Sequence, residues 1–124
     1  MVHAIGLDIV EIDRIRLDIK RYGDSFIRRI LSDKERDSFV ARADRELFLS
    51  GRFACKEAVI KALGFRLKER PSYTDLEIIN SDTGIPVLKL PEDIKKQLDP
   101  ANVLISITHE KNYAAAVAII TEDS

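Results

Sequence analysis

A long helical segment in the middle of the chain constrains the fold more than any other feature of the sequence. Residues 44 to 64 place apolar side chains at the three- and four-residue spacing of one helix face. Asp44 can cap the start of this helix, and Gly64 can end it, because glycine tolerates the backbone conformation found at helix C-termini. We therefore predict one long helix as the central element of the fold.

The segment before this helix predicts a strand followed by short helices. Residues 3 to 12 alternate between two faces, as the side chains of a β-strand do. One face carries Ile5, Leu7 and Ile9. Asp8 lies on the other face, among small or apolar neighbours. Residues 13 to 43 predict short helices, for which the candidate caps are Asp24 in one case and Ser32 or Asp33 in another.

The segment after the long helix predicts two pairs of strands. Residues 72 to 90 fit a hairpin with its turn at residues 81 to 84, and residues 101 to 120 fit a second pair. A brief helix can open at Pro91 between them. Strands thus flank a helical middle without the regular alternation of a doubly wound fold. We predict an α+β fold, with a mainly antiparallel sheet packed against a long central helix and shorter helices.

Composition and charge limit the classes of protein to consider. The 124 residues fit a single domain spanning 1–124, and 45% apolar with 33% charged residues is typical of a folded, soluble protein. The net charge of −1 gives no general attraction to nucleic acid or to an anionic membrane. Cys55 is the single cysteine, which excludes an intrachain disulfide and favours a location in the reducing cytoplasm. We interpret Cys55 as a small packing residue. No apolar run approaches the roughly 20 residues that span a bilayer.

Glu57 is a candidate for chemistry because of its place on the long helix. It falls within an apolar stripe of the helix wheel, and Lys61 lies at the edge of that stripe. A lone carboxylate there is costly to desolvate, so it needs a cation, a hydrogen-bond donor or an opening to solvent. One interpretation is an ion pair between Glu57 and Lys61, one helical turn apart. The other is that Glu57 binds a ligand.

Asp8 has similar alternatives, because an acid in a short apolar strand can cap a neighbouring segment or face water at a sheet edge. Paired with Glu57, however, it suits Mg²⁺, which usually takes one or two carboxylates and fills its other positions with water and phosphate oxygens. The pair therefore points toward phosphate chemistry. Nearby positive charge would come from Lys61, Lys56 or Arg52.

Two further features are open to more than one interpretation. His109 follows a predicted strand, where it can bind phosphate, transfer a proton or simply be exposed. Residues 14 to 29 carry six basic residues against two acidic ones. This basic segment is either a solvated helical face or a docking surface for an acidic protein. Its pattern does not favour nucleic acid.

Several motifs together resemble the 4'-phosphopantetheinyl transferase superfamily, in its group of small proteins. They appear in the family's order: GLDIVEIDRI, FIRRILSDKE, GRFACKEAVIKALG, TGIPVLKL and ISITHEKNYAAAVAI. The resemblance covers nearly the whole chain. It implies transfer of the 4'-phosphopantetheine group of coenzyme A to a serine of an apo acyl carrier protein in fatty acid biosynthesis, with adenosine 3',5'-bisphosphate as the second product.

The resemblance also implies roles for particular residues. Asp8 and Glu57 would bind Mg²⁺ beside the diphosphate of coenzyme A, and Lys61 would contact phosphate. The residues implied to line the coenzyme site are Arg52, Phe53, Lys61, Gly64, Pro86, Ser106 and His109. Arg14 and Arg21 would receive an acidic helix of the carrier protein. A homotrimer with active sites at its subunit interfaces is implied as well.

One departure from the family concerns the segment after the long helix. A glycine-rich run is common there, whereas this chain has Phe-Arg-Leu-Lys at residues 65 to 68. Arg66 or Lys68 would then supply charge in place of backbone amides.

Several alternatives stay open from the sequence. The group that deprotonates the serine is Asp8 or Glu57, acting through water, or else His109. Other function classes are a noncatalytic module that binds an acidic protein and a metal-dependent phosphohydrolase.

Overall fold

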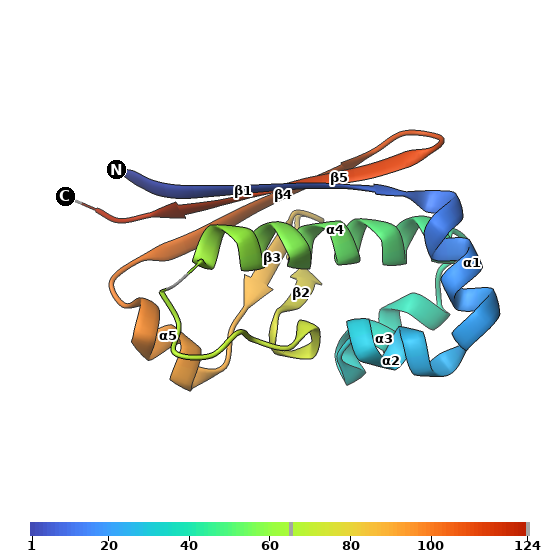
Figure 1. Ribbon diagram of the computed structural model, residues 1–124, viewed down its shortest axis with the longest axis horizontal. Coiled ribbons are helices and arrows are strands. Elements are labelled where there is room, and N and C mark those ends of the chain that lie inside the picture. The colour runs from blue at the N-terminus through green and yellow to red at the C-terminus, as the bar shows by residue number, and fades with distance from the viewer. Residues whose placement is uncertain (65, 124) are drawn as a thin grey trace.

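Helix α4 (Arg45–Leu63) lies along one face of a three-stranded antiparallel sheet (Figure 1). In spatial order the strands are β1 (Val2–Glu11), β5 (Tyr113–Thr121) and β4 (Asn102–His109). This computed structural model describes residues 1–64 and 66–123. The predicted α+β fold, with an antiparallel sheet against a long central helix, is confirmed.

Small residues bring α4 into close contact with the sheet. They are Ala54, Ala58 and Ala62 on the helix and Ala114, Ala116 and Ala118 on β5. Gly6 of β1 lies directly against the helix, since a β-carbon at this position would overlap the carbonyl oxygen of Ala58. Asp8 follows two residues later on the same face of β1, so the close contact places its carboxylate beside α4.

Both predicted ends of α4 are confirmed, although the first is stabilised in another way. Asp44 occupies the N-cap position, but its carboxylate accepts a hydrogen bond from Arg42 Nε at 2.7 Å rather than from the helix. Gly64 ends the helix with a φ of 52°, which other residues rarely adopt. Neither α4 nor any other described helix is long and apolar enough to cross a membrane.

Three short helices cover the first half of α4 at one end of the molecule (Figure 1). They are α1 (Ile12–Tyr22), α2 (Asp24–Ile30) and α3 (Asp33–Val40). Ser32 caps α3 in a reciprocal pair of hydrogen bonds with Glu35, as one of the predicted alternatives required. The cap predicted for α2 is wrong: Gly23 holds that position, and the Asp24 carboxylate accepts a hydrogen bond from Arg28 instead, at 2.8 Å.

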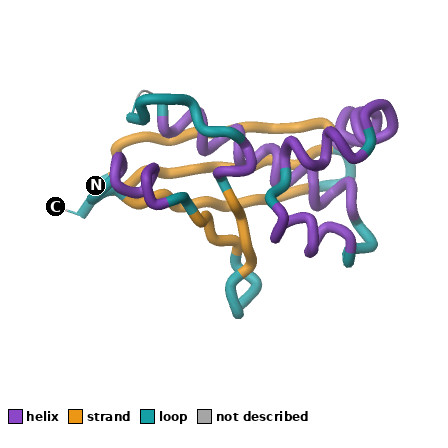
Figure 2. Tube along the Cα trace, turned by 90° about the horizontal axis from the view of Figure 1, so that it is seen from below, coloured by secondary structure: helices purple, strands orange, loops and turns teal. Residues whose placement is uncertain are grey.

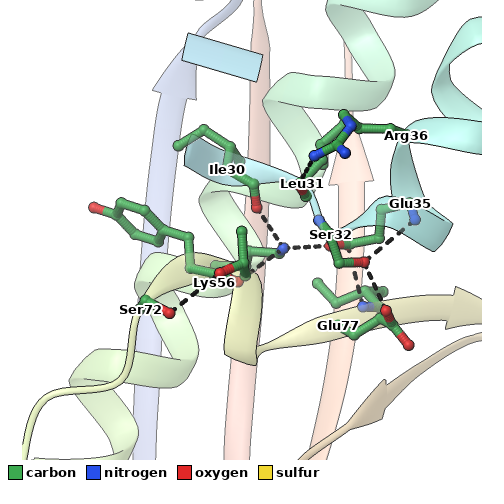
Figure 3. A network of polar contacts seen from close by, with 11 residues as sticks. Ile30, Leu31, Ser32, Glu35, Arg36, Lys56, Ser72 and Glu77 are labelled. Carbon is green, nitrogen blue, oxygen red and sulfur yellow. Dashed lines mark hydrogen bonds and ion pairs between the residues drawn. The ribbon is translucent and has the colours of Figure 1, made fainter. Parts of the chain in front are cut away.

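A buried ion pair between Lys56 and Glu35 joins these helices to the rest of the fold (Figure 3). Lys56 Nζ lies 2.6 Å from Glu35 Oε1 and also donates to the carbonyl oxygens of Ile30 and Tyr73, at 2.6 and 3.0 Å. Burial lowers the pKa of Lys56, and the neighbouring Glu35 carboxylate opposes this shift. Lys56 therefore has a structural role in the core, and the expectation that it supplies charge near the phosphate site is wrong.

A second, two-stranded sheet is formed by β2 (Glu77–Asn80) and β3 (Pro86–Lys89), and its ribbon runs across the direction of the three long strands (Figure 2). The turn lies where it was predicted, with Gly84 N–H donating to the Ser81 carbonyl at 2.8 Å. The start of the predicted first strand is wrong, however. Tyr73–Asp75 forms a 3₁₀ helix, η1, because Ser72 and Asp75 cap each other. Helix α5 (Glu92–Leu98) follows Pro91, as predicted.

Candidate active site

Asp8 and Glu57 line the same cleft, although one comes from β1 and the other from α4. The cleft has a volume of about 610 Å³. Its other polar and aromatic lining residues are Glu11, Arg14, Asp18, Phe53 and Tyr113. The Asp8 side chain is 17% exposed and that of Glu57 is 23% exposed, so both carboxylates are sheltered yet open to a ligand. We call this the carboxylate cleft.

Lys61 bridges the helix and the strand beside this cleft. Its ammonium donates to Asp8 Oδ1 at 2.9 Å and to the Leu7 carbonyl oxygen at 3.0 Å. The alternative of a helical ion pair between Lys61 and Glu57 is wrong, because Lys61 reaches across to β1. The Lys61 side chain is 54% exposed, which leaves it free to exchange Asp8 for a bound anion.

Glu57 has partners of its own, from the segment between α4 and β2. The Tyr73 hydroxyl donates a hydrogen bond to Glu57 Oε1, and Arg70 Nη2 lies 3.8 Å from the same oxygen. The pKa of Tyr73 is raised, first by burial and then by this hydrogen bond. Neither Tyr73 nor Arg70 was predicted as a site residue from the sequence. The capping pattern at residues 72 to 75 was the one available signal, since it predicts the turn that carries Tyr73.

The two carboxylates of the cleft fit Mg²⁺ better than they fit a metal ion whose ligands all come from the protein. Among residues 1–64 and 66–123, no group of three or more His, Cys, Asp or Glu side chains is arranged to hold a metal ion. Two sheltered carboxylates from separate elements match the small number of protein ligands that Mg²⁺ usually takes, with water and phosphate oxygens completing its shell. The cleft therefore suits a metal that arrives with, or binds, a phosphate compound.

A second cleft, of about 200 Å³, contains three of the other residues expected at a coenzyme site. Arg52, Pro86 and His109 line it together. Arg52 is only 8% exposed, and its guanidinium lies 4.4 Å from the centre of the Phe48 ring. We call this the arginine cleft.

Arg52 is incompletely paired within the arginine cleft. Its Nη2 donates to Asn80 Oδ1 at 3.3 Å, whereas its Nε finds no hydrogen-bond partner in the part of the chain that the structure describes. Burial lowers the pKa of Arg52, because a charged guanidinium is poorly solvated there. A buried cation with a spare donor is a favourable place for an anion.

The remaining predicted residues lie elsewhere. Phe53 lines the carboxylate cleft, whereas Gly64 is exposed at the end of α4. Ser106 is exposed on β4, on the sheet face opposite α4. Phe65 lies outside the described residues, and Arg66, which follows it, is exposed. One chain thus does not bring all the predicted coenzyme residues into a single pocket.

The basic segment forms part of α1 and α2. Two of its arginines have acidic partners, Arg16 with Asp13 and Arg28 with Asp24. Arg21 is exposed in the last turn of α1. Arg14 lines the carboxylate cleft itself, so this basic surface adjoins the candidate active site.

Comparison with known proteins identifies the chain's relatives. Residues 4–118 match the 4'-phosphopantetheinyl transferase superfamily. The chain is 40% identical to a holo-[acyl-carrier-protein] synthase of Shewanella amazonensis over 122 residues, which covers 96% of this chain and 98% of the relative.

Two solved structures extend this result to the fold. The holo-[acyl-carrier-protein] synthase of Neisseria meningitidis superposes with a TM-score of 0.90 at 29% identity, covering 98% of this chain and 100% of that one. The Helicobacter pylori synthase, in complex with coenzyme A, has a TM-score of 0.82 at 32% identity, covering 94% and 99%. These matches confirm the resemblance found in the motifs. The chain therefore belongs to the 4'-phosphopantetheinyl transferase superfamily, in its group of holo-[acyl-carrier-protein] synthases.

Proposed function

We propose that this protein transfers the 4'-phosphopantetheine group of coenzyme A to a serine of apo acyl carrier protein, in fatty acid biosynthesis. The products are holo acyl carrier protein and adenosine 3',5'-bisphosphate. The observation that carries this proposal is the carboxylate cleft, which Asp8, Glu57 and Arg14 line and in which Asp8 is paired with Lys61. A coenzyme A complex of the similar Helicobacter pylori synthase supports the choice of donor.

Asp8 and Glu57 would hold Mg²⁺, which when bound supplies positive charge to neutralise the diphosphate. Lys61 would contribute by leaving Asp8 for a phosphate oxygen, since its side chain is half exposed. The serine oxygen forms a bond to the β-phosphorus, and the bond from that phosphorus to the bridging oxygen breaks. The serine proton would pass through water to Asp8 or Glu57, the two carboxylates that line this cleft.

The arginine cleft is suited to a phosphate of the nucleotide end of coenzyme A. Arg52 offers a buried positive charge with an Nε–H that no group in residues 1–64 and 66–123 accepts, and His109 and Arg42 line the same space. An anion here would restore the hydrogen bonding that the guanidinium lacks. We also assign Pro86 to this half of the coenzyme site.

The protein would assemble as a homotrimer. The sheet face opposite α4 exposes Ile5, Leu7, Ile9 and Leu104, at 64, 65, 65 and 57%. Burying such a surface between subunits is favourable, at about 25 cal/mol per Å² of apolar area. Since one chain divides the coenzyme residues between two clefts, the carboxylate cleft of one subunit would join the arginine cleft of a neighbour. Exposed Ser106 on β4 would then face the interface.

The basic surface of α1 and α2 would bind the acyl carrier protein. Arg14 and Arg21 are both exposed, and Arg14 also lines the carboxylate cleft. An acidic helix docked there would deliver its serine to the phosphates. The enzyme would act as a single domain in the cytoplasm, where its one cysteine, Cys55, stays reduced.

The intact mass of apo acyl carrier protein, incubated with this protein, coenzyme A and Mg²⁺, tests the proposal. A mass gain of one phosphopantetheine group that is lost in Asp8→Ala and Glu57→Ala, and kept in the matched control Asp93→Ala on α5, would support it. No mass gain with several carrier proteins would contradict it. Release of phosphopantetheine without a carrier protein would indicate a hydrolase instead.

A further inference from the structure

Tyr73 contacts the candidate metal ligand Glu57. Tyr73 itself is not among the described residues that line the carboxylate cleft. Its hydroxyl donates to Glu57 Oε1, whereas no hydrogen bond to Oε2 is formed within the part of the chain described. One carboxylate oxygen is therefore anchored, and the other stays available. A glutamate has three rotatable side-chain bonds, so an anchor of this kind restricts where the available oxygen can lie.

The Tyr73 side chain is itself held from several directions. Its ring packs edge-on against Phe53 at 5.5 Å between centroids, and the Arg70 guanidinium lies over it at 5.8 Å. Its carbonyl oxygen accepts a hydrogen bond from Lys56 Nζ at 3.0 Å. Lys56 precedes Glu57 on α4 and is fixed by its buried ion pair with Glu35 (Figure 3). The same helix turn therefore holds both ends of the contact between Tyr73 and Glu57.

The position of Tyr73 follows from η1. The mutual capping of Ser72 and Asp75 turns the chain at this point, so that residue 73 faces back toward α4. A tyrosine at this place delivers a hydroxyl to Glu57, whereas phenylalanine would fill the same volume without it. The ring can account for packing, and the hydroxyl needs a separate explanation.

We propose that Tyr73 is a positioning residue, whose hydroxyl orients the Glu57 carboxylate so that its second oxygen is ready to bind the divalent cation. This inference rests on the function proposed above. Partners that orient metal-binding side chains commonly contribute about 10- to 100-fold to metal affinity. Tyr73 acts through Glu57 and takes no direct part in the transfer of the phosphopantetheine group.

Binding of Mn²⁺ to the full-length protein, followed by electron paramagnetic resonance with coenzyme A present and no carrier protein, tests this inference. We expect Tyr73→Phe to weaken Mn²⁺ binding about tenfold. Tyr22→Phe, which removes an exposed hydroxyl on α1, should leave binding unchanged. In a Glu57→Gln background, Tyr73→Phe should cause no further loss.

The kinetic signature separates positioning from simple stabilisation. In Tyr73→Phe, the Mg²⁺ concentration for half-maximal rate should rise about tenfold, while kcat at saturating Mg²⁺ stays within about twofold of the original. A fall in kcat at every Mg²⁺ concentration, with unchanged Mn²⁺ affinity, would overturn the inference.

The outcomes for the two proposals are distinguishable. If Glu57→Gln binds Mn²⁺ as well as the unmodified protein does, the metal site and the proposed function both fail. If Glu57→Gln loses Mn²⁺ but Tyr73→Phe does not, only the role of Tyr73 fails.

A second measurement avoids any variant at position 73 and so covers the case in which Tyr73→Phe does not fold. In protein labelled with 3-fluorotyrosine, the ¹⁹F resonance of Tyr73 should shift when Mg²⁺ and coenzyme A are added. The Glu57→Gln variant should not show this shift. An unmoved Tyr73 resonance in the unmodified sequence would overturn the inference.

Discussion

Lys61 Nζ lies 2.9 Å from Asp8 Oδ1 and thereby links the central helix to the first strand across 53 positions of the sequence. The same carboxylate is a candidate ligand of Mg²⁺, and the ammonium offsets its negative charge. Because Lys61 is half exposed, this pair contributes little to stability, on the order of 1 kcal/mol or less. Its main importance lies in binding the substrate.

Replacement of Lys61 should therefore impair function more than folding. We expect Lys61→Met to raise the KM for coenzyme A about tenfold, because a charge-assisted hydrogen bond to phosphate is lost. The free energy of unfolding should change by less than about 1 kcal/mol. Steady-state kinetics and urea denaturation measure the two effects, with Lys34→Met, an exposed lysine on α3, as the control. A large loss of stability with unchanged KM would contradict this assignment.

Arg52 should contribute to binding of the nucleotide end. We expect Arg52→Gln to weaken binding of adenosine 3',5'-bisphosphate by about 10- to 100-fold, corresponding to about 1.5 to 3 kcal/mol for a hydrogen bond to a charged group. Isothermal titration calorimetry measures this change. Arg45→Gln alters an exposed arginine at the start of α4 and serves as the control. Equal affinity in Arg52→Gln and the original protein would argue against an anion site at this residue.

The buried thiol of Cys55 should make stability depend on pH in the alkaline range. Burial raises its pKa from 9.0 to about 12. Between these values the unfolded thiol has released its proton and the folded one has not, so stability falls as pH rises. Above pH 9.0 the loss should approach about 1.4 kcal/mol per pH unit.

Comparison with Cys55→Ala isolates this effect from other groups that titrate at high pH. Urea denaturation from pH 8 to 10.5 should give a steeper fall for the original protein than for the variant. Parallel slopes would contradict burial of the thiol. The folded protein should also resist thiol reagents at neutral pH, since the reactive thiolate is absent there.

The apolar outer face of the sheet should control assembly. If the protein forms the proposed homotrimer, we expect Ile5→Lys to convert it into monomers, because three charged side chains would have to be buried at the interfaces. Light scattering coupled to size-exclusion chromatography measures the mass. Val40→Lys, at an exposed apolar position on α3, is the matched control. If Ile5→Lys stays trimeric, the subunits must associate through another surface. If the unmodified protein is monomeric, the proposed homotrimer is wrong.

The regular elements could be predicted because their signals are local. The alternation of Ile5, Leu7 and Ile9 and the termination of α4 at Gly64 depend on neighbours within a few positions. The same is true of the last two strands, which pair across a short turn.

The candidate site was less accessible to sequence analysis, since its contacts join distant segments. A helix wheel shows only the neighbours within one helix, so it pairs Lys61 with Glu57. In the folded chain Lys61 instead pairs with Asp8 on β1. The sequence left Lys56 available to bind phosphate, but in the structure its ammonium pairs with Glu35, 21 positions away. Tyr73 reaches Glu57 only because η1 turns the chain back.

Strand β1 carries Asp8 on the face toward α4 and three exposed apolar residues on the other face, in strict alternation. Inserting or deleting one residue ahead of Ile5 would move every later residue of the strand to the opposite face of the sheet. The isoleucines would then meet the helix, and the carboxylate would turn away from it. During evolution this strand can therefore accept substitutions far more readily than changes of length.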